Sequence, residues 1–254
     1  MGRLKAETLR AYVSAIRSRH VDYGILIAAF KDPIVHRLLA RAAAISPSAK
    51  KDKQPITRDI LAQVVTHGPS LPDVNTDAAF TLAFAGFLRM GEITYTTAEL
   101  KNRTTFLAKK ATRHDITFTP SGMTFRLKWS KADKQHQGVD VAIAAVGGPL
   151  CLVAAITKLF NRDPQPLNSP LFSLNGKPFT SPGVRKILSS RLVAAGINPS
   201  SYLNHSFRRG AAQFAEDSGC SHQQIQQLGR WSSEAFRLYI RTKTTDLRRL
   251  NSHF

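Results

Sequence analysis

Residues 205–239, which read HSFRRGAAQFAEDSGCSHQQIQQLGRWSSEAFRLY, decide the fold of this chain. Gly219 can end one helix where Ser221 can begin the next, so residues 206–218 and 221–229 are predicted helices. His205 and Arg208 stand three residues apart at a helix start, where both side chains and free backbone N–H groups can face one anion. The stretch therefore predicts a phosphate-sized site on a helical domain.

Taken alone, each of these residues has an ordinary structural explanation. An isolated H-x-x-R is more often a plain helix start, and a single Trp231 or Tyr239 is more often part of a core. Tyr239 lies on a predicted helix, residues 233–241, between apolar neighbours. The functional interpretation depends on further residues upstream.

The composition points to a polyanionic partner. Thirty-six Lys and Arg against 17 Asp and Glu give a formal charge of +19 over 254 residues, so nucleic acid is the leading predicted partner. Cys151 and Cys220 are too few for a disulfide framework or a Cys-based zinc site. Without a signal-peptide pattern or a membrane-length apolar run, the sequence predicts an intracellular protein, nuclear in a eukaryote and otherwise cytoplasmic.

The pattern along the chain is typical of a mainly α fold with a small three-stranded antiparallel β-sheet, an α+β class. Apolar spacing predicts helices at residues 7–20, 33–44, 56–65, 77–93, 149–160 and 181–196. Period-two runs predict strands at 116–120, 123–130 and 139–143. The Pro- and Lys-rich residues 47–55 are predicted to link a helical unit, residues 1–46, to a larger domain, residues 56–254.

Two upstream features are typical of a phosphate site. Arg89 follows a strongly apolar segment, so it must either reach solvent or serve a purpose at the end of a buried helix. Lys128, Lys131 and Lys134 lie at a predicted strand turn, where a solvated lysine is the ordinary explanation for each. Lys131 is preferred because it begins the turn in the sequence SKAD.

In this order the residues resemble the tyrosine recombinases, also called phage-type integrases, over nearly the whole chain. GFLRMGEI is similar to the family's first arginine box, SKAD to its catalytic hairpin lysine and HSFRRG to its H-x-x-R box. The wording of HSFRRG, LGRWSSEAF and YIR is most similar to crypton-type integrases of eukaryotic mobile elements. The catalytic residues that the resemblance implies are Arg89, Lys131, His205, Arg208, Trp231 and Tyr239, with Glu92 in support.

The resemblance implies the DNA breaking-rejoining catalytic fold and an enzyme that cuts and rejoins double-stranded DNA through a covalent 3′-phosphotyrosine. No metal, cofactor or ATP is expected, because arginines neutralise the phosphorane and the phosphotyrosine conserves the bond energy. Family members carry a four-helix core-binding domain, of which residues 1–46 supply at most two helices, and a tetramer on DNA is possible. The residues predicted to contact DNA are Arg10, Arg17, Lys50, Lys51, Lys53, Arg209 and Arg230.

Three other functions fit parts of the sequence. The helices 206–218 and 221–229 resemble a helix-turn-helix, which suits a non-catalytic DNA-binding protein derived from a mobile element. A type IB topoisomerase shares the tyrosine chemistry, although the compact HSFRRG box favours a recombinase. A metal-dependent nuclease has no support from His, Cys or carboxylate spacing.

Overall fold

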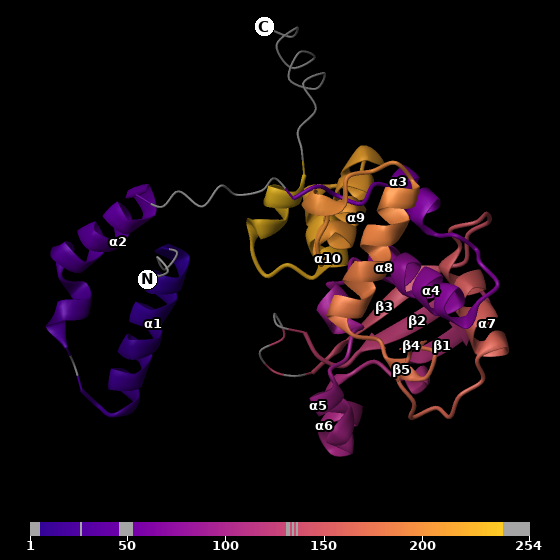
Figure 1. The fold of residues 1–254 in the computed structure, drawn as a ribbon, viewed down its shortest axis with the longest axis horizontal. Coiled ribbons are helices and arrows are strands. Elements are labelled where there is room, and N and C mark those ends of the chain that lie inside the picture. Colours follow the sequence, from indigo (N-terminus) through magenta and orange to yellow (C-terminus); the bar gives the residue numbers. More distant parts are fainter. Residues whose placement is uncertain are drawn as a thin grey trace, which may run out of the picture. The chain divides into compact units, whose positions relative to one another are not determined.

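The computed structural model describes residues 6–25, 27–45, 53–130, 133, 135 and 137–240, and the chain divides into two compact units, residues 1–52 and 53–254. In the first unit, α1 (Ala6–Asp22) and α2 (Pro33–Ile45) form a helical pair joined through the short helix η1 (Ala28–Lys31) (Figure 1). Pro33 begins α2, where its missing N–H costs no hydrogen bond.

The second unit is mainly helical, as predicted. Its α-helices are α3 (Arg58–Val64), α4 (Leu71–Ala85), α5 (Thr97–Lys101), α6 (Arg103–Lys109), α7 (Leu152–Arg162), α8 (Ser181–Ala194), α9 (Ser206–Asp217) and α10 (His222–Gly229). Short 3-10 helices are η2 (Met90–Glu92), η3 (Arg113–Asp115), η4 (Pro199–Ser201) and η5 (Glu234–Tyr239). The predicted fold class is confirmed.

The three predicted strands form one antiparallel sheet in the order β1 (Ile116–Thr119), β2 (Gly122–Leu127), β3 (Val139–Ala144). Ile116 pairs with Phe125, and Phe125 pairs with Val141. Alternate residues of β2 face the core, where Phe125 is fully buried. A second, two-stranded ribbon, β4 (Ser173–Leu174) with β5 (Lys177–Pro178), was not predicted.

Helix α4 forms the centre of the second unit, and α7 and α9 pack against it (Figure 1). The rings of Phe80 on α4 and Phe207 on α9 lie 4.9 Å apart between centroids, so the start of α9 is fixed against the most buried helix. The predicted helix at 77–93 was misplaced at both ends. It begins after Ser70, whose side chain accepts the Asp73 N–H, and it ends at Ala85.

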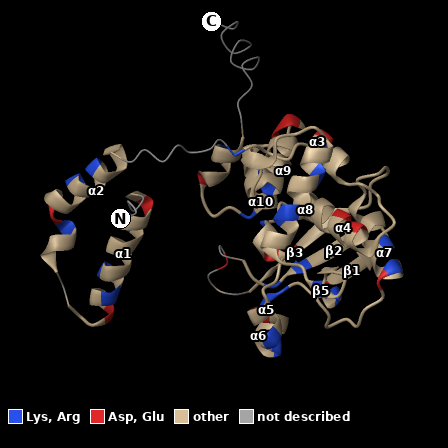
Figure 2. Ribbon diagram, in the orientation of Figure 1, with Lys and Arg blue, Asp and Glu red and all other residues tan. Residues whose placement is uncertain are grey.

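Basic residues are spread over the helices of both units (Figure 2). Within the described residues, no helix combines the length and apolar character needed to cross a membrane. In the same part of the chain, no three His, Cys, Asp or Glu side chains gather in a way that could hold a metal ion.

Candidate active site

The sequence predicted a helix over residues 77–93, which would include Arg89. In the structure Arg89 lies beyond the end of α4. Gly86 caps α4, Phe87 takes a left-handed backbone conformation with φ 51°, and Arg89 then begins η2. The Arg89 Nη1 donates to Glu92 Oε1 over 2.9 Å, and the Arg89 backbone N–H donates to Glu92 Oε2 over 2.8 Å. Glu92 is buried, so this carboxylate fixes both the backbone and the guanidinium of Arg89.

His205 and Arg208 are brought to Arg89 by a backbone contact between distant segments. The Met90 N–H donates to the carbonyl of Asn204, the residue before His205, over 3.2 Å. His205 then occupies the N-cap of α9, and its Nδ1 is buried without a hydrogen-bond partner. The segment that carries Arg89 therefore lies beside the start of the H-x-x-R segment.

The guanidinium of Arg208 is almost completely buried and is held by backbone oxygens. Its Nη1 donates to the Phe87 carbonyl over 2.9 Å, its Nη2 donates to the Gly229 carbonyl, and its Nε is buried without a partner. A guanidinium carries five N–H donors, so these two bonds leave capacity for an anion. The left-handed turn at Phe87 is what points its carbonyl at Arg208.

The electrostatics of this cluster favour an anionic ligand. Burial, followed by the charge of Arg89, lowers the pKa of Arg208 to about 10, while Glu92 opposes the shift. Burial also lowers the pKa of His205, and the charges of Arg89, Arg208 and Lys53 lower it further. Arg208 stays charged at neutral pH, whereas His205 is held toward its neutral form. A bound phosphate would relieve the repulsion between these groups.

Trp231 packs its ring face on Arg208. The Arg208 Cζ lies 4.3 Å from the Trp231 ring centroid, and the Tyr239 ring lies 5.7 Å from the same indole. Trp231 also contacts Phe87 edge-on and is 9% exposed. The indole therefore joins the arginine to the tyrosine by packing. The catalytic role that the resemblance implies for Trp231 stays a prediction.

Tyr239 lies at the end of η5, a 3-10 helix, where the sequence had predicted an α-helix over residues 233–241. The ring is partly buried, and Phe236 anchors the turn in the core with 2% exposure. The charge of Tyr239, were it ionised, would raise the pKa of Arg208, which reflects the closeness of the two side chains. The fold thus brings residues 89, 205, 208, 231 and 239 into one region, and their catalytic roles stay predictions.

Glycine at position 229 makes room for the indole. A Cβ at Gly229 would lie 1.6 Å from Cζ3 of Trp231, which is an impossible contact. The next residue, Arg230, has a left-handed backbone with φ 55°, and this conformation ends α10. Gly229 and Arg230 together turn the chain so that Trp231 reaches Arg208.

Arg230 and Arg209 were predicted to contact DNA, and both donate to backbone carbonyls. The Arg230 Nη2 donates to Phe87 O over 3.2 Å, so Arg208 and Arg230 share one acceptor. Its Nη1 donates to Leu228 O over 3.1 Å. Burial and the charge of Arg89 lower the pKa of Arg230, and Glu92 opposes this shift. Arg230 thus belongs to the same charge cluster, which sequence reasoning had missed.

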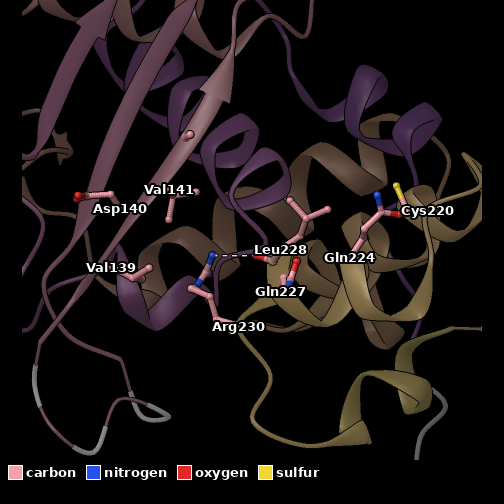
Figure 3. A pocket seen from close by; sticks show the side chains of 9 residues that line it. Val139, Asp140, Val141, Cys220, Gln224, Gln227, Leu228 and Arg230 are labelled. Atoms are coloured by element: carbon pink, nitrogen blue, oxygen red, sulfur yellow. Dashed lines mark hydrogen bonds between the residues drawn. The ribbon is translucent and has the colours of Figure 1, made fainter.

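A cavity of about 420 Å³ between β3 and α10 adjoins this cluster. Figure 3 shows Val139 and Val141 of β3 on one side, Leu228 and Gln224 of α10 on the other, and Arg230 between them. The lining is largely apolar apart from Arg230, Asp140 and glutamine side chains. β3, the strand that follows the predicted lysine turn, therefore lies close to Arg230 across this cavity.

The structure describes only some of the remaining predicted site residues. Lys131 and Lys134, like Lys50 and Lys51, lie outside the described residues. Lys128 is described, and its Nζ pairs with Asp115 Oδ2 at 2.8 Å while also donating to Lys110 O and Thr112 Oγ1. These contacts tie Lys128, the residue after the end of β2, to residues 110–115. Of the other predicted DNA contacts, Arg10, Arg17 and Lys53 are exposed.

Comparison with known proteins shows what the chain is similar to. No family model matches the chain. The "Integrase/recombinase xerD homolog" of Selenomonas ruminantium is 26% identical over 243 residues, which cover 91% of this chain and 66% of that protein. The chain is similar in sequence to this recombinase and resembles the tyrosine recombinases. It spans about two thirds of the length of this curated relative.

Solved tyrosine recombinase structures share the fold. XerH recombinase in a post-cleavage complex with difH substrate gives a TM-score of 0.60 at 15% identity, over 81% of this chain and 54% of XerH. The Tn1549 transposon integrase in complex with circular intermediate DNA gives 0.60 at 14% identity, over 98% and 79%. XerA recombinase gives 0.56 at 16% identity, over 87% and 76%. The tyrosine recombinase fold therefore extends over most of the chain.

Proposed function

We propose that this chain is a site-specific DNA recombinase that cleaves and rejoins double-stranded DNA through a covalent 3′-phosphotyrosine on Tyr239. The observation that carries the proposal is the convergence of Arg89, His205, Arg208 and Tyr239, which come from segments far apart in sequence, at one buried and positively charged cluster. The xerD-like relative and the DNA complexes of XerH and the Tn1549 integrase support it.

In this mechanism Arg89 and Arg208 bind the non-bridging oxygens of one DNA phosphate. The phenol oxygen of Tyr239 attacks phosphorus and the bond to the 5′ oxygen breaks, which leaves a 3′-phosphotyrosine and a free 5′ hydroxyl. The lowered pKa of His205 suits its neutral imidazole to accept the phenol proton. Lys131, by resemblance, donates a proton to the leaving 5′ oxygen. Attack by a second 5′ hydroxyl reverses these steps, so neither ATP nor a metal ion is required.

The proposed division of labour between the two units follows from the same chemistry. Residues 1–46 would act as part of a DNA clamp, residues 47–55 as a basic linker and residues 56–254 as the catalytic domain. A homo-oligomer on DNA would pair two cleavage events, which strand exchange requires. Such an enzyme acts where DNA is held, in the nucleus of a eukaryote and otherwise in the cytoplasm.

The test is a covalent capture assay. A pool of short duplexes with randomised sequence and a single nick is incubated with the full chain in EDTA and resolved on a denaturing gel. The nick lets the short 5′ strand diffuse away, so the phosphotyrosine accumulates. We expect an adduct from the native chain and from Tyr202→Phe, a matched control, and none from Tyr239→Phe. Absence of an adduct above the Tyr239→Phe background would falsify the proposal.

Arg89 provides the cleanest test of the phosphate site. Its side chain is 26% exposed, whereas Arg208 is almost completely buried and donates to the Phe87 and Gly229 carbonyls. Removal of Arg89 therefore disturbs the core less than removal of Arg208. Arg89→Ala is expected to slow adduct formation by roughly a hundredfold, about 3 kcal/mol of transition-state stabilisation. An unchanged rate at saturating duplex would remove Arg89 from the mechanism.

A non-catalytic DNA-binding protein is the second candidate. The turn between α9 and α10, with Gly219 at φ 83° and Ser221 capping α10, has the form of a helix-turn-helix. This function predicts duplex binding with no adduct from any variant. A type IB topoisomerase predicts an adduct together with relaxation of a supercoiled plasmid by the native chain alone.

A further inference from the structure

Arg209 makes two contacts with the Tyr239 segment and one with the backbone of Lys53. Its Nη2 donates to the Leu238 carbonyl over 3.1 Å, and its Cζ lies 5.2 Å from the centroid of the Tyr239 ring. Its Nη1 donates to the carbonyl of Lys53, the first residue of the second unit. One guanidinium therefore joins the end of η5 to the point where the chain enters this unit.

The segment that Arg209 holds has little other support. η5 is a six-residue 3-10 helix, a geometry with poorer hydrogen bonds than an α-helix. Phe236 anchors its middle in the core, but Leu238 is 77% exposed and the closing bond from the Ile240 N–H to Arg237 O is 3.4 Å long. The ion pair between Arg237 and Glu234 is exposed and contributes little. The position of Tyr239 therefore depends on Trp231 on one side and Arg209 on the other.

The opposite end of the Arg209 contact is itself well fixed. The Gln54 N–H donates to Ser201 O and the Ile56 N–H to Ser206 O, both over 2.9 Å, so the backbone following Lys53 is bound to the end of η4 and to the start of α9. Arg209 lies on α9 one residue after Arg208. A guanidinium that is anchored on this helix and donates to Lys53 O can hold the Leu238 carbonyl in a fixed place.

We propose that Arg209 is a positioning residue that holds the Tyr239 nucleophile against the charge cluster by tying the end of η5 to α9 and to Lys53. The proposal rests on the proposed function for its catalytic consequence. It differs from the prediction that Arg209 contacts DNA phosphates, because it assigns Nη1 and Nη2 to protein carbonyls, and the phosphate contact stays a prediction.

Hydrogen exchange in the free protein tests whether Arg209 holds the end of η5 in place. Loss of hydrogen bonds from a charged donor to two carbonyls is expected to speed amide exchange of residues 236–240 by about tenfold or more in Arg209→Ala. Arg209→Lys, which keeps a donor, should lie between Arg209→Ala and the native chain. Arg237→Ala, which removes an exposed guanidinium from the same turn, is the matched control and should leave exchange unchanged. Equal exchange in Arg209→Ala and the native chain would overturn the proposal.

Adduct formation with the duplexes captured by the native chain tests the catalytic consequence. Arg209→Ala is expected to lower the single-turnover rate at saturating duplex by at least about tenfold with duplex affinity within about twofold, because misplacing a nucleophile costs rate. A phosphate contact predicts the reverse: weaker binding, a salt slope reduced by about one, and an unchanged rate. That second pattern would contradict the proposal.

The two assays separate this proposal from the proposed function. If the native chain forms no adduct but Arg209→Ala loosens residues 236–240, the recombinase function fails and the positioning contact stands. If the native chain forms an adduct and Arg209→Ala reacts equally fast with unchanged exchange, the function stands and the positioning role fails.

Discussion

The imidazole of His205 lies at the start of α9 with a buried Nδ1 that has no hydrogen-bond partner, next to the charges of Arg89 and Arg208. Its pKa in the folded chain is lowered from 6.5, so as pH falls through this value the unfolded chain binds the proton first. The contribution of neutral His205 to stability is therefore complete above about pH 6.5 and is lost toward its folded pKa.

The melting temperature measured from pH 7.5 to pH 5 checks this prediction. The native chain is expected to lose more stability on acidification than His205→Gln, which has no proton to gain. His114→Gln removes an exposed histidine and should behave like the native chain. Parallel pH profiles for His205→Gln and the native chain would show that burial does not disfavour the charged imidazole.

Trp231 gives a second prediction, because its ring covers Arg208 and contacts Tyr239. Trp231→Ala should lower the free energy of unfolding by about 3–5 kcal/mol, since it leaves a cavity beside a buried charge. Trp231→Phe keeps a ring face for the guanidinium and should cost less than about half of this. Urea unfolding measures both. Equal losses for the two substitutions would mean that stacking on Arg208 contributes nothing.

At the scale of single residues, spacing and residue type predicted part of the cluster. His205 and Arg208 share a helix face because they are three apart, a relation that needs no tertiary information. Spacing could not predict that the guanidinium groups of Arg209 and Arg230 donate to backbone carbonyls of the protein. Their acceptors are the carbonyls of Lys53, Phe87, Leu228 and Leu238, and every residue type carries a carbonyl.

Among the elements, α9 is held by a contact that only glycine permits. A Cβ at Gly210 would lie 1.6 Å from the Ile56 carbonyl oxygen, while the Ile56 N–H donates to Ser206 O on the same helix. Gly210→Ala must therefore separate α9 from the segment that follows Lys53. We expect a loss of several kcal/mol, on the order of the largest single-residue effects.

Gly91→Ala is the matched control for this prediction. An added Cβ at Gly91 meets no atom within 4 Å, so its unfolding free energy should stay within about 0.5 kcal/mol of the native value. Denaturant titration compares the two variants. A mild effect of Gly210→Ala, similar to that of Gly91→Ala, would show that α9 can shift without cost.

Local signals located most elements but not the ones that depend on tertiary contacts. Helix α3 lies within the predicted range 56–65, and Thr57 caps its start because its side chain accepts the Ile60 N–H. Helix α4 was predicted to start near Asn75, yet Asn75, Thr76 and Asp77 are buried inside it. Partners from other segments account for this: the Ser173 N–H donates to Asn75 Oδ1, and Arg191 pairs with Asp77.

At the scale of the whole molecule, the buried hydrophobic core lies in the second unit. The buried hydrophobic cluster extends from Ile56 to Phe236, whereas Ala6 alone is buried among the described residues before position 46. Residues 53–254 are therefore expected to unfold cooperatively by themselves, with a midpoint within a few degrees of that of the full chain. Circular dichroism melting checks this, and a broad transition would contradict it.

The same fragment should bind DNA less tightly. It lacks Arg10, Arg17, Lys50 and Lys51, so the salt dependence of duplex binding should fall by up to about four in slope on a log–log plot. Fluorescence anisotropy at several salt concentrations measures the slope. An identical slope for fragment and full chain would mean that these four residues do not neutralise phosphates.

The guanidinium groups of Arg208, Arg209 and Arg230 all donate to backbone carbonyls. The Phe87 carbonyl accepts from both Arg208 and Arg230. The other acceptors are the carbonyls of Gly229, Leu228, Lys53 and Leu238. Replacement of an acceptor's side chain leaves its oxygen in place. Alanine scanning would thus find the arginines essential and would miss the peptide groups that aim them. Grafting this cluster onto another scaffold would require copying the backbone turns at positions 87 and 230 rather than the side chains around them.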